Sequence, residues 1–168
     1  MRRNIVLAGF MGTGKSAVGQ IAAERLGLTF VDTDDLIEAR VGRSIAEVFE
    51  NDGEPAFRQL EADVCRHVAS QNGHVIATGG GALLNPETRA AFERGGLVIC
   101  LSADLDAIIA RVGVDPSRPL FAAGRERLAR LLEQRSALYD SLPHQIDTTH
   151  LSPEQVAEEV IRLWKQYA

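Results

Sequence analysis

Short apolar runs alternate with longer amphipathic stretches along the whole chain. The apolar runs predict strands at residues 4–8, 29–31, 74–77, 97–101 and 145–147. The amphipathic stretches predict helices at residues 15–26, 34–41, 45–51, 55–71, 86–94, 105–112, 125–141 and 153–166. This alternation indicates a three-layer α/β/α fold, in which helices cover both faces of a central five-stranded parallel sheet.

Local sequence supports the predicted helix ends. Pro86 follows Asn85, and Pro153 follows Ser152, so each proline stands at a first helical position behind a capping residue. The chain of 168 residues contains no internal repeat, low-complexity tract or linker. We therefore expect a single domain that spans residues 1–168.

The first predicted strand leads into the sequence GFMGTGKS at residues 9–16, which a helix follows. Strand, G-x-x-x-x-G-K-S and helix in this order predict a phosphate-binding P-loop. Its backbone N–H groups face phosphates, Lys15 adds positive charge, and the Ser16 hydroxyl can bind Mg²⁺. The alternative is a glycine-rich turn before an ordinary helix. The residues expected to hold the nucleotide phosphates are Gly12, Thr13, Gly14, Lys15, Ser16 and Ala17.

Composition and charge narrow the expected partners. An apolar content of 45% with mixed charge indicates a folded protein, and no apolar run reaches the roughly 18 residues that a membrane span needs. A net charge of −5 without a basic stripe argues against nucleic acid. Cys65 and Cys100 lack metal-binding spacing and predict reduced thiols, and a strand at residue 4 leaves no room for a signal peptide. We expect a cytoplasmic protein that binds a small anion.

Two carboxylates follow the second predicted strand. Asp32 and Asp34 would lie at the carboxyl edge of the sheet, where open α/β sheets bind ligands. The chain lacks the N-K-x-D motif of GTPases, whereas small-molecule kinases bring acidic groups to the metal and to the acceptor hydroxyl. The same residues could cap the next helix, and the two roles are compatible.

A second glycine cluster, Gly79 to Gly81, follows the strand at 74–77. Three consecutive glycines cost chain entropy, which is typical of backbone that approaches a ligand closely, although a simple turn is the alternative. The same strand lacks the terminal aspartate of an ordinary Walker B motif. We therefore expect the metal near Asp32.

Three arginines are further candidates. Arg58 and Arg135 could form a bidentate clamp for a carboxylate, although either alone is typical of an exposed surface residue. Segment 113–124 has a glycine at each end and two prolines between them, and it carries Arg118. A connection of this length is typical of a mobile, water-excluding lid, with a plain surface loop as the alternative.

Together these motifs resemble those of the shikimate kinase family, in the same order over essentially the whole chain. The matching segments are residues 9–19, 32–34, 44–49, 53–61, 79–81 and 118–120, and Arg135 with Tyr139. The resemblance implies a P-loop fold like that of nucleoside monophosphate kinases and MgATP-dependent phosphorylation of the shikimate 3-hydroxyl, in aromatic amino-acid biosynthesis. It places the shikimate-binding region at about residues 32–61 and the lid at 113–124.

The resemblance also implies the roles of individual residues. Lys15 and Arg118 would stabilise the transferring phosphoryl group. Ser16 would bind Mg²⁺ directly, and Asp32 would bind it through water. Asp34 would hold the acceptor hydroxyl and act as its base.

On the acceptor side, the resemblance implies two arginines on the shikimate carboxylate, a glycine-lined pocket and an apolar wall. These residues are Arg58 and Arg135, then Gly79, Gly80 and Gly81, then Phe49 and Phe57. On the nucleotide side, Arg111 would lie against adenine, and the base would either stack weakly on His150 or rest on backbone and Pro153. Many relatives have a basic residue near His150, so the role of this histidine is left open.

Two other functions compete with this one. The chain could phosphorylate another small hydroxylated acid, such as gluconate, or it could be an inactive relative that only binds nucleotide. The arginine pair favours a carboxylate, and the chain keeps the acidic and arginine positions that inactive relatives usually lose. Nothing in the sequence indicates an extended partner surface, so we expect a monomer.

Overall fold

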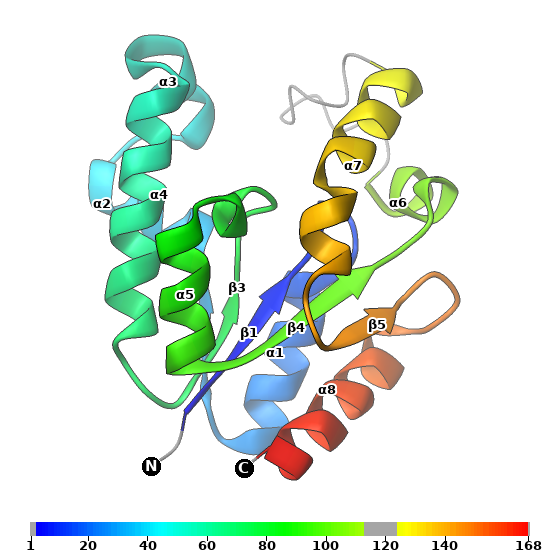
Figure 1. The fold of residues 1–168 in the computed structure, drawn as a ribbon. Coiled ribbons are helices and arrows are strands. Elements are labelled where there is room, and N and C mark those ends of the chain that lie inside the picture. Colours follow the sequence, from blue (N-terminus) through cyan, green and yellow to red (C-terminus); the bar gives the residue numbers. More distant parts are fainter. Residues whose placement is uncertain (1–2, 113–123, 168) are drawn as a thin grey trace.

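A five-stranded parallel sheet forms the middle layer, in the order β2-β3-β1-β4-β5 (Figure 1). The computed structural model describes residues 3–112 and 124–167. Neighbouring strands are parallel in all four pairings. The strands are β1 (Asn4–Ala8), β2 (Thr29–Asp32), β3 (His74–Ala77), β4 (Gly96–Ser102) and β5 (Gln145–Asp147).

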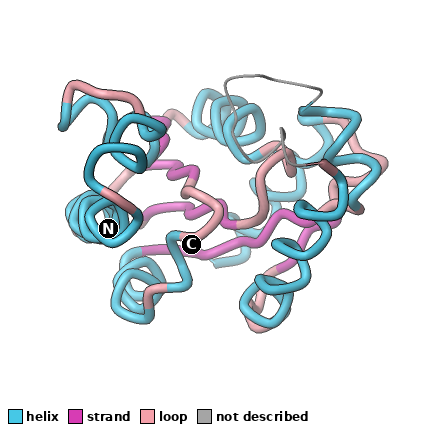
Figure 2. Tube along the Cα trace, turned by 90° about the horizontal axis from the view of Figure 1, so that it is seen from above, coloured by secondary structure: helices cyan, strands magenta, loops and turns pink. Residues whose placement is uncertain are grey.

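Helices cover both faces of this sheet (Figure 2). They are α1 (Lys15–Leu26), α2 (Thr33–Val41), α3 (Ile45–Asp52), α4 (Glu54–Ala69), α5 (Pro86–Gly95), α6 (Leu105–Val112), α7 (Arg125–Asp140) and α8 (Pro153–Tyr167). A short 3-10 helix, η1 (Ala82–Leu84), follows β3. The predicted three-layer α/β/α fold with five parallel strands is therefore confirmed.

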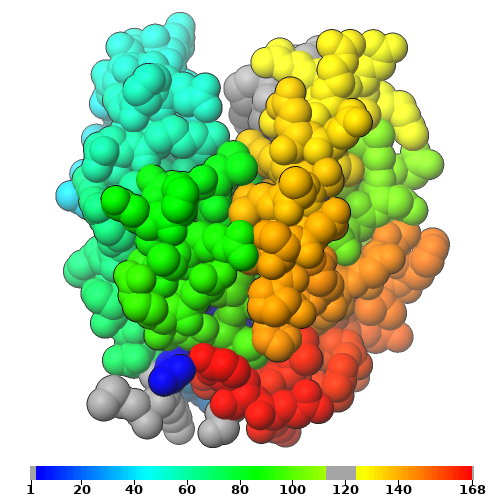
Figure 3. Space-filling model, viewed as in Figure 1, coloured from blue at the N-terminus to red at the C-terminus, as the bar shows by residue number. Residues whose placement is uncertain are grey.

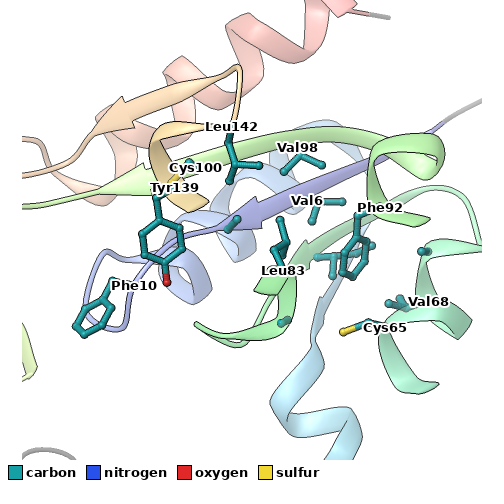
Figure 4. Packing of buried hydrophobic residues seen from close by; sticks show 14 of the residues in the cluster. Val6, Phe10, Cys65, Val68, Leu83, Phe92, Val98, Cys100, Tyr139 and Leu142 are labelled. Atoms are coloured by element: carbon teal, nitrogen blue, oxygen red, sulfur yellow. The ribbon is translucent and has the colours of Figure 1, made fainter. Parts of the chain in front are cut away.

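The central strand shows why the strands are continuously apolar. Successive side chains point to opposite faces, so Ile5 and Leu7 pack with α1 and α8, whereas Val6 and Ala8 pack with α4, α5 and α7. All four side chains are buried. Figure 4 shows part of the apolar cluster that contains Val6. A strand buried on both faces cannot alternate apolar and polar residues.

A third apolar cluster is formed by helices alone. Ile37, Val48, Phe57 and Val64 pack together, and they come from α2, α3 and α4. In Figure 1, α3 and the start of α4 lie at the top left, and the rest of α4 runs alongside the sheet. The space-filling view shows a hollow at the top of the molecule, between α3 and α4 on one side and α7 on the other (Figure 3).

Every predicted strand and helix is present, and no end differs by more than two residues. The predicted caps are confirmed: Asn85 accepts hydrogen bonds from the N–H groups of Glu87 and Thr88, and Ser152 accepts one from Gln155. The sequence patterns missed η1, which is too short to show a period. Residues 113–123 of the predicted lid, with Arg118, lie outside the described residues. In the described part of the chain, no helix is long and apolar enough to cross a membrane.

Asn4 links two strands through its side chain and provides a test of the sheet. Its amide donates to the Gln71 carbonyl at 2.7 Å and accepts from His74 N–H at 3.0 Å, and the residue is fully buried. Asn4→Ala leaves both backbone partners unpaired, so we expect a loss of about 1–3 kcal/mol in the free energy of unfolding, measured with urea.

Asn51→Ala is the matched control, because Asn51 is exposed near the end of α3. It should change the free energy of unfolding by less than about 0.5 kcal/mol. Equal losses in the two variants would contradict the bridging role of Asn4.

Candidate active site

The loop between β1 and α1 is built to expose backbone donors. Gly14 has a φ of 96° at the N-cap of α1, a conformation that favours glycine. The Thr13 hydroxyl donates to the Phe10 carbonyl at 2.7 Å and closes the turn. A glycine-rich loop that leads into the N-terminus of a helix can bind an anion through its backbone N–H groups.

The Lys15 ammonium is turned back onto this loop. It donates to the carbonyls of Gly9 and Phe10, both at 2.8 Å. Burial lowers the pKa of Lys15 to about 8, although the nearby carboxylates of Asp34 and Asp32 oppose the shift. The ammonium is thus held within the loop, where phosphate oxygens can replace the two carbonyls.

A cavity of about 780 Å³ opens beside this loop. It lies at the carboxyl ends of the parallel strands, where open α/β sheets bind ligands, and its volume suits a small molecule. Its lining includes Gly12, Thr13, Gly14, Lys15, Ser16, Ala17, Asp32, Asp34, Gly79, Gly80, Arg111, Thr148, Leu151 and Pro153.

The Asp32 carboxylate accepts hydrogen bonds from two other residues. One carboxylate oxygen accepts from the N–H of Asp34 at 2.9 Å and caps α2, and the other accepts from the Ser16 hydroxyl at 2.8 Å. The predicted helix cap is therefore present, and a hydroxyl and a carboxylate lie side by side. These hard oxygen donors suit Mg²⁺. Within residues 3–112 and 124–167, no group of three or more His, Cys, Asp or Glu could hold a metal, so Mg²⁺ here would also need ligand oxygens.

Asp34 is a half-buried carboxylate that lines the same cavity. Burial raises its pKa to about 6, with further contributions from the negative charges of Asp32 and Glu61, while Lys15 opposes the shift. A carboxylate with a pKa near the working pH can accept a proton from a hydroxyl efficiently.

The three glycines 79–81 make room for side chains from other elements. A Cβ on the first would lie 2.9 Å from both Asp34 Oδ1 and Glu61 Oε2. A Cβ on the second would lie 2.8 Å from Arg135 Nη1, and one on the third would lie 2.7 Å from Arg58 Nη1. Real Cβ atoms do not approach other atoms so closely. The glycines thus let charged side chains approach the backbone closely, which a simple turn would not require.

Arg58 is held by a buried carboxylate that the sequence patterns missed. Its guanidinium donates to Glu61 Oε1 at 2.8 Å, and Glu61 is only 4% exposed. Burial raises the pKa of Glu61, and the hydrogen bond and charge of Arg58 oppose this effect. The spacing of three residues on one helix could have indicated the pair. Nearby, the rings of Phe49 and Phe57 pack with centroids 4.6 Å apart, and Phe49 is partly exposed.

Arg135 is buried, so the alternative of an exposed surface residue is wrong for it. Its guanidinium carbon lies 5.7 Å from the centroid of the Phe10 ring, in a cation–π contact. Arg135 therefore lies between the P-loop and the glycines 79–81. Arg58, Arg135, Phe49, Phe57 and Gly81 do not line the 780 Å³ cavity, and they form an adjoining region.

Arg111 connects the P-loop to the segment after β5. It donates to the Thr148 hydroxyl at 2.8 Å, and that hydroxyl also lies 3.1 Å from the Thr13 carbonyl. Pro153 lines this end of the cavity, whereas His150 is exposed and does not. Thr148 was not predicted, because a single threonine after a short strand carries no distinctive pattern.

The chain matches the family model described as shikimate kinase over residues 11–165. It is 42% identical over 167 residues to a shikimate kinase of Pelotomaculum thermopropionicum, and the match covers 98% of this chain and 97% of that one. It is 47% identical over 156 residues to a shikimate kinase of Desulforudis audaxviator, with 92% and 82% covered.

A solved shikimate kinase structure is similar to this chain as well. The shikimate kinase from Acinetobacter baumannii, in complex with shikimate, superposes with a TM-score of 0.93 at 33% identity, covering 99% of this chain and 95% of its own. A gluconokinase from Sinorhizobium meliloti has a TM-score of 0.64 at 17% identity and shares the fold alone. The family model and the full-length relatives agree with the geometry of the site, and the chain belongs to the shikimate kinase family.

Proposed function

We propose that this kinase transfers the γ-phosphoryl group of ATP to the 3-hydroxyl of shikimate, giving shikimate 3-phosphate and ADP for aromatic amino-acid synthesis. One observation carries the proposal: a carboxylate of raised pKa and two guanidinium groups surround the glycines 79–81, and the P-loop ammonium acts on the same carboxylate. That a relative was solved with bound shikimate supports the choice of acceptor.

On the phosphate side, residues 12–17 would cradle ATP. Lys15 would leave its two loop carbonyls for phosphate oxygens and stabilise the transferring group. Ser16 would hold Mg²⁺ directly and Asp32 through water, as their adjacent oxygens allow. Bound Mg²⁺ would neutralise phosphate charge. We assign Arg118 to the same phosphoryl group on its position in the sequence alone.

On the acceptor side, Asp34 would take the proton of the attacking hydroxyl. Arg58 and Arg135 would bind the shikimate carboxylate in fork geometry, beside the glycines 79–81. Phe49 and Phe57 would form the apolar wall. Catalysis would rest on positioning and on charge stabilisation rather than on a covalent intermediate.

On the adenine side, Arg111 and Pro153 would contact the base, since both line the end of the cavity that lies beyond the P-loop. His150 would not contribute, because it is exposed and outside the lining.

We further propose one catalytic domain in which about residues 32–61 bind shikimate and residues 113–124 form a lid. The apolar cluster that α2, α3 and α4 share supports the first assignment, because it packs the helices of this region against one another. A cytoplasmic monomer remains our proposal for the state of the protein.

The proposed reaction is tested by ADP release from MgATP with and without shikimate. We expect ADP release that depends on shikimate and stays at background with gluconate. Turnover with gluconate alone would identify a different acid kinase. Nucleotide binding without turnover on either acid would identify an inactive relative.

Asp34→Asn tests the proposed base. The amide cannot accept the proton, so we expect kcat to fall by about 10²- to 10⁴-fold, while the ATP dissociation constant stays within about threefold. Asp140→Asn is the matched control, because Asp140 is exposed at the end of α7, and its kcat should match that of the original protein. Unchanged kcat in Asp34→Asn would refute the role of Asp34.

The pH dependence gives a separate test. Because Asp34 must be ionised, kcat/KM should rise with pH and level off above the raised pKa of about 6. Because Lys15 must be protonated, kcat/KM should fall again above its lowered pKa of about 8. Rates measured between pH 5 and 9 check this bell shape. A flat profile between pH 5 and 7 would contradict the acidic limb.

A further inference from the structure

Tyr139 belongs to a motif whose purpose the proposed function leaves unexplained. It lies near the end of α7, four residues after Arg135, so the two side chains share one face of the helix. The residue is only 7% exposed, and its ring packs in the core with Phe10, Cys100 and Leu142 (Figure 4). A buried phenol needs a hydrogen-bond partner, and the identity of that partner is informative.

The phenol of Tyr139 donates to the Gly80 carbonyl at 2.6 Å. The point at which a Gly80 Cβ would lie is 3.8 Å from the phenol oxygen and 2.8 Å from Arg135 Nη1. Tyr139 and Arg135 therefore flank the same glycine. Burial raises the pKa of Tyr139 to about 12, against the charge and hydrogen bonding of Arg135, so the phenol keeps the proton it donates.

This contact fixes more than one group. The peptide between Gly80 and Gly81 is planar, so holding its carbonyl also fixes the direction of the Gly81 N–H. Glycine backbone has unusual freedom, and three glycines in sequence would otherwise sample many conformations. The phenol thus restricts the part of the backbone that Asp34, Arg58 and Arg135 approach.

The backbone of Tyr139 is itself anchored. Its carbonyl accepts from the Gln145 side chain at 2.5 Å and from the Leu142 N–H at 3.1 Å. Gln145 begins β5, so the end of α7 is tied to the sheet. The sheet thus holds the end of α7 in place, and the phenol of Tyr139 in turn holds the Gly80 carbonyl.

We propose that Tyr139 is a positioning residue that holds the Gly80 carbonyl beside the Arg135 guanidinium, in the arrangement that receives the acceptor's carboxylate. This inference rests on the proposed function for the identity of the acceptor. Tyr139 does not touch the reacting atoms, so its loss should weaken acceptor binding more than it slows phosphoryl transfer.

Tyr139→Phe keeps the ring in the core and removes only the phenol oxygen. Losing one hydrogen bond of ordinary strength should raise the shikimate KM by about 3- to 10-fold. The ATP KM should stay within about twofold, because the phenol donates its hydrogen bond to Gly80 and not to a residue of the P-loop. Steady-state kinetics with each substrate varied in turn measure this split.

Tyr167→Phe is the matched control. Tyr167 also uses its phenol in one hydrogen bond, which it accepts from Arg3 at 2.9 Å, and its ring stacks on Trp164 at the end of α8. This control should leave both KM values unchanged. An unchanged shikimate KM in Tyr139→Phe, or an equal rise in both KM values, would overturn the proposal.

Amide hydrogen exchange provides a readout that needs no substrate. The N–H groups of Ala82 and Leu84 bond to the carbonyls of Gly79 and Gly81, both at 3.1 Å. Their exchange should accelerate in Tyr139→Phe and not in Tyr167→Phe, and equal exchange in both variants would count against Tyr139. If the original protein releases no shikimate-dependent ADP, the proposed function fails, and faster exchange in Tyr139→Phe would still support the hold on Gly80.

Discussion

The site depends on the close approach of charged side chains to the backbone of the three glycines 79–81. At residues 79–81 the chain has no side chains, and Asp34, Arg58 and Arg135 come from three separate helices to occupy that space. Any Cβ at these positions would lie under 3.0 Å from a charged group. The glycines cost conformational entropy, and the hydrogen bond from Tyr139 to Gly80 opposes that cost by holding the loop.

The electrostatics of the site follow from this crowding. Asp34 and Glu61 face the same glycine, and burial together with mutual repulsion raises the pKa of Asp34. The nearby cations limit the shift: Lys15 acts on Asp34, and Arg58 pairs with Glu61. Burial lowers the pKa of Lys15 in turn. The two pKa values therefore shift toward each other, that of Asp34 upward and that of Lys15 downward, which is typical of ionisable groups in functional sites.

The sheet brings these groups together. All the strands are parallel, so the loops that follow β1, β2, β3 and β5 emerge at one edge, although they are far apart in the sequence. The P-loop, the Asp32–Asp34 turn, the glycines and Thr148 each follow a strand end. Apolar clusters on both faces of β1 stabilise the sheet. The cluster that α2, α3 and α4 form includes Phe57, the neighbour of Arg58 on α4, and so helps to position Arg58.

The sequence by itself determined the elements, the fold class and the family. Strand and helix periods are local, and caps such as Asn85 act within a few residues, so the predicted ends of the elements agree with the structure to within two residues. The P-loop was recognisable because its chemistry lies in one continuous segment. Only the tertiary structure decided which glycine faces which charge, that Glu61 holds Arg58, that Arg135 is buried, and that Thr148 and Tyr139 bond to distant backbone. Those contacts join residues from separate elements, and their distances depend on how the helices pack on the sheet, which no local pattern encodes.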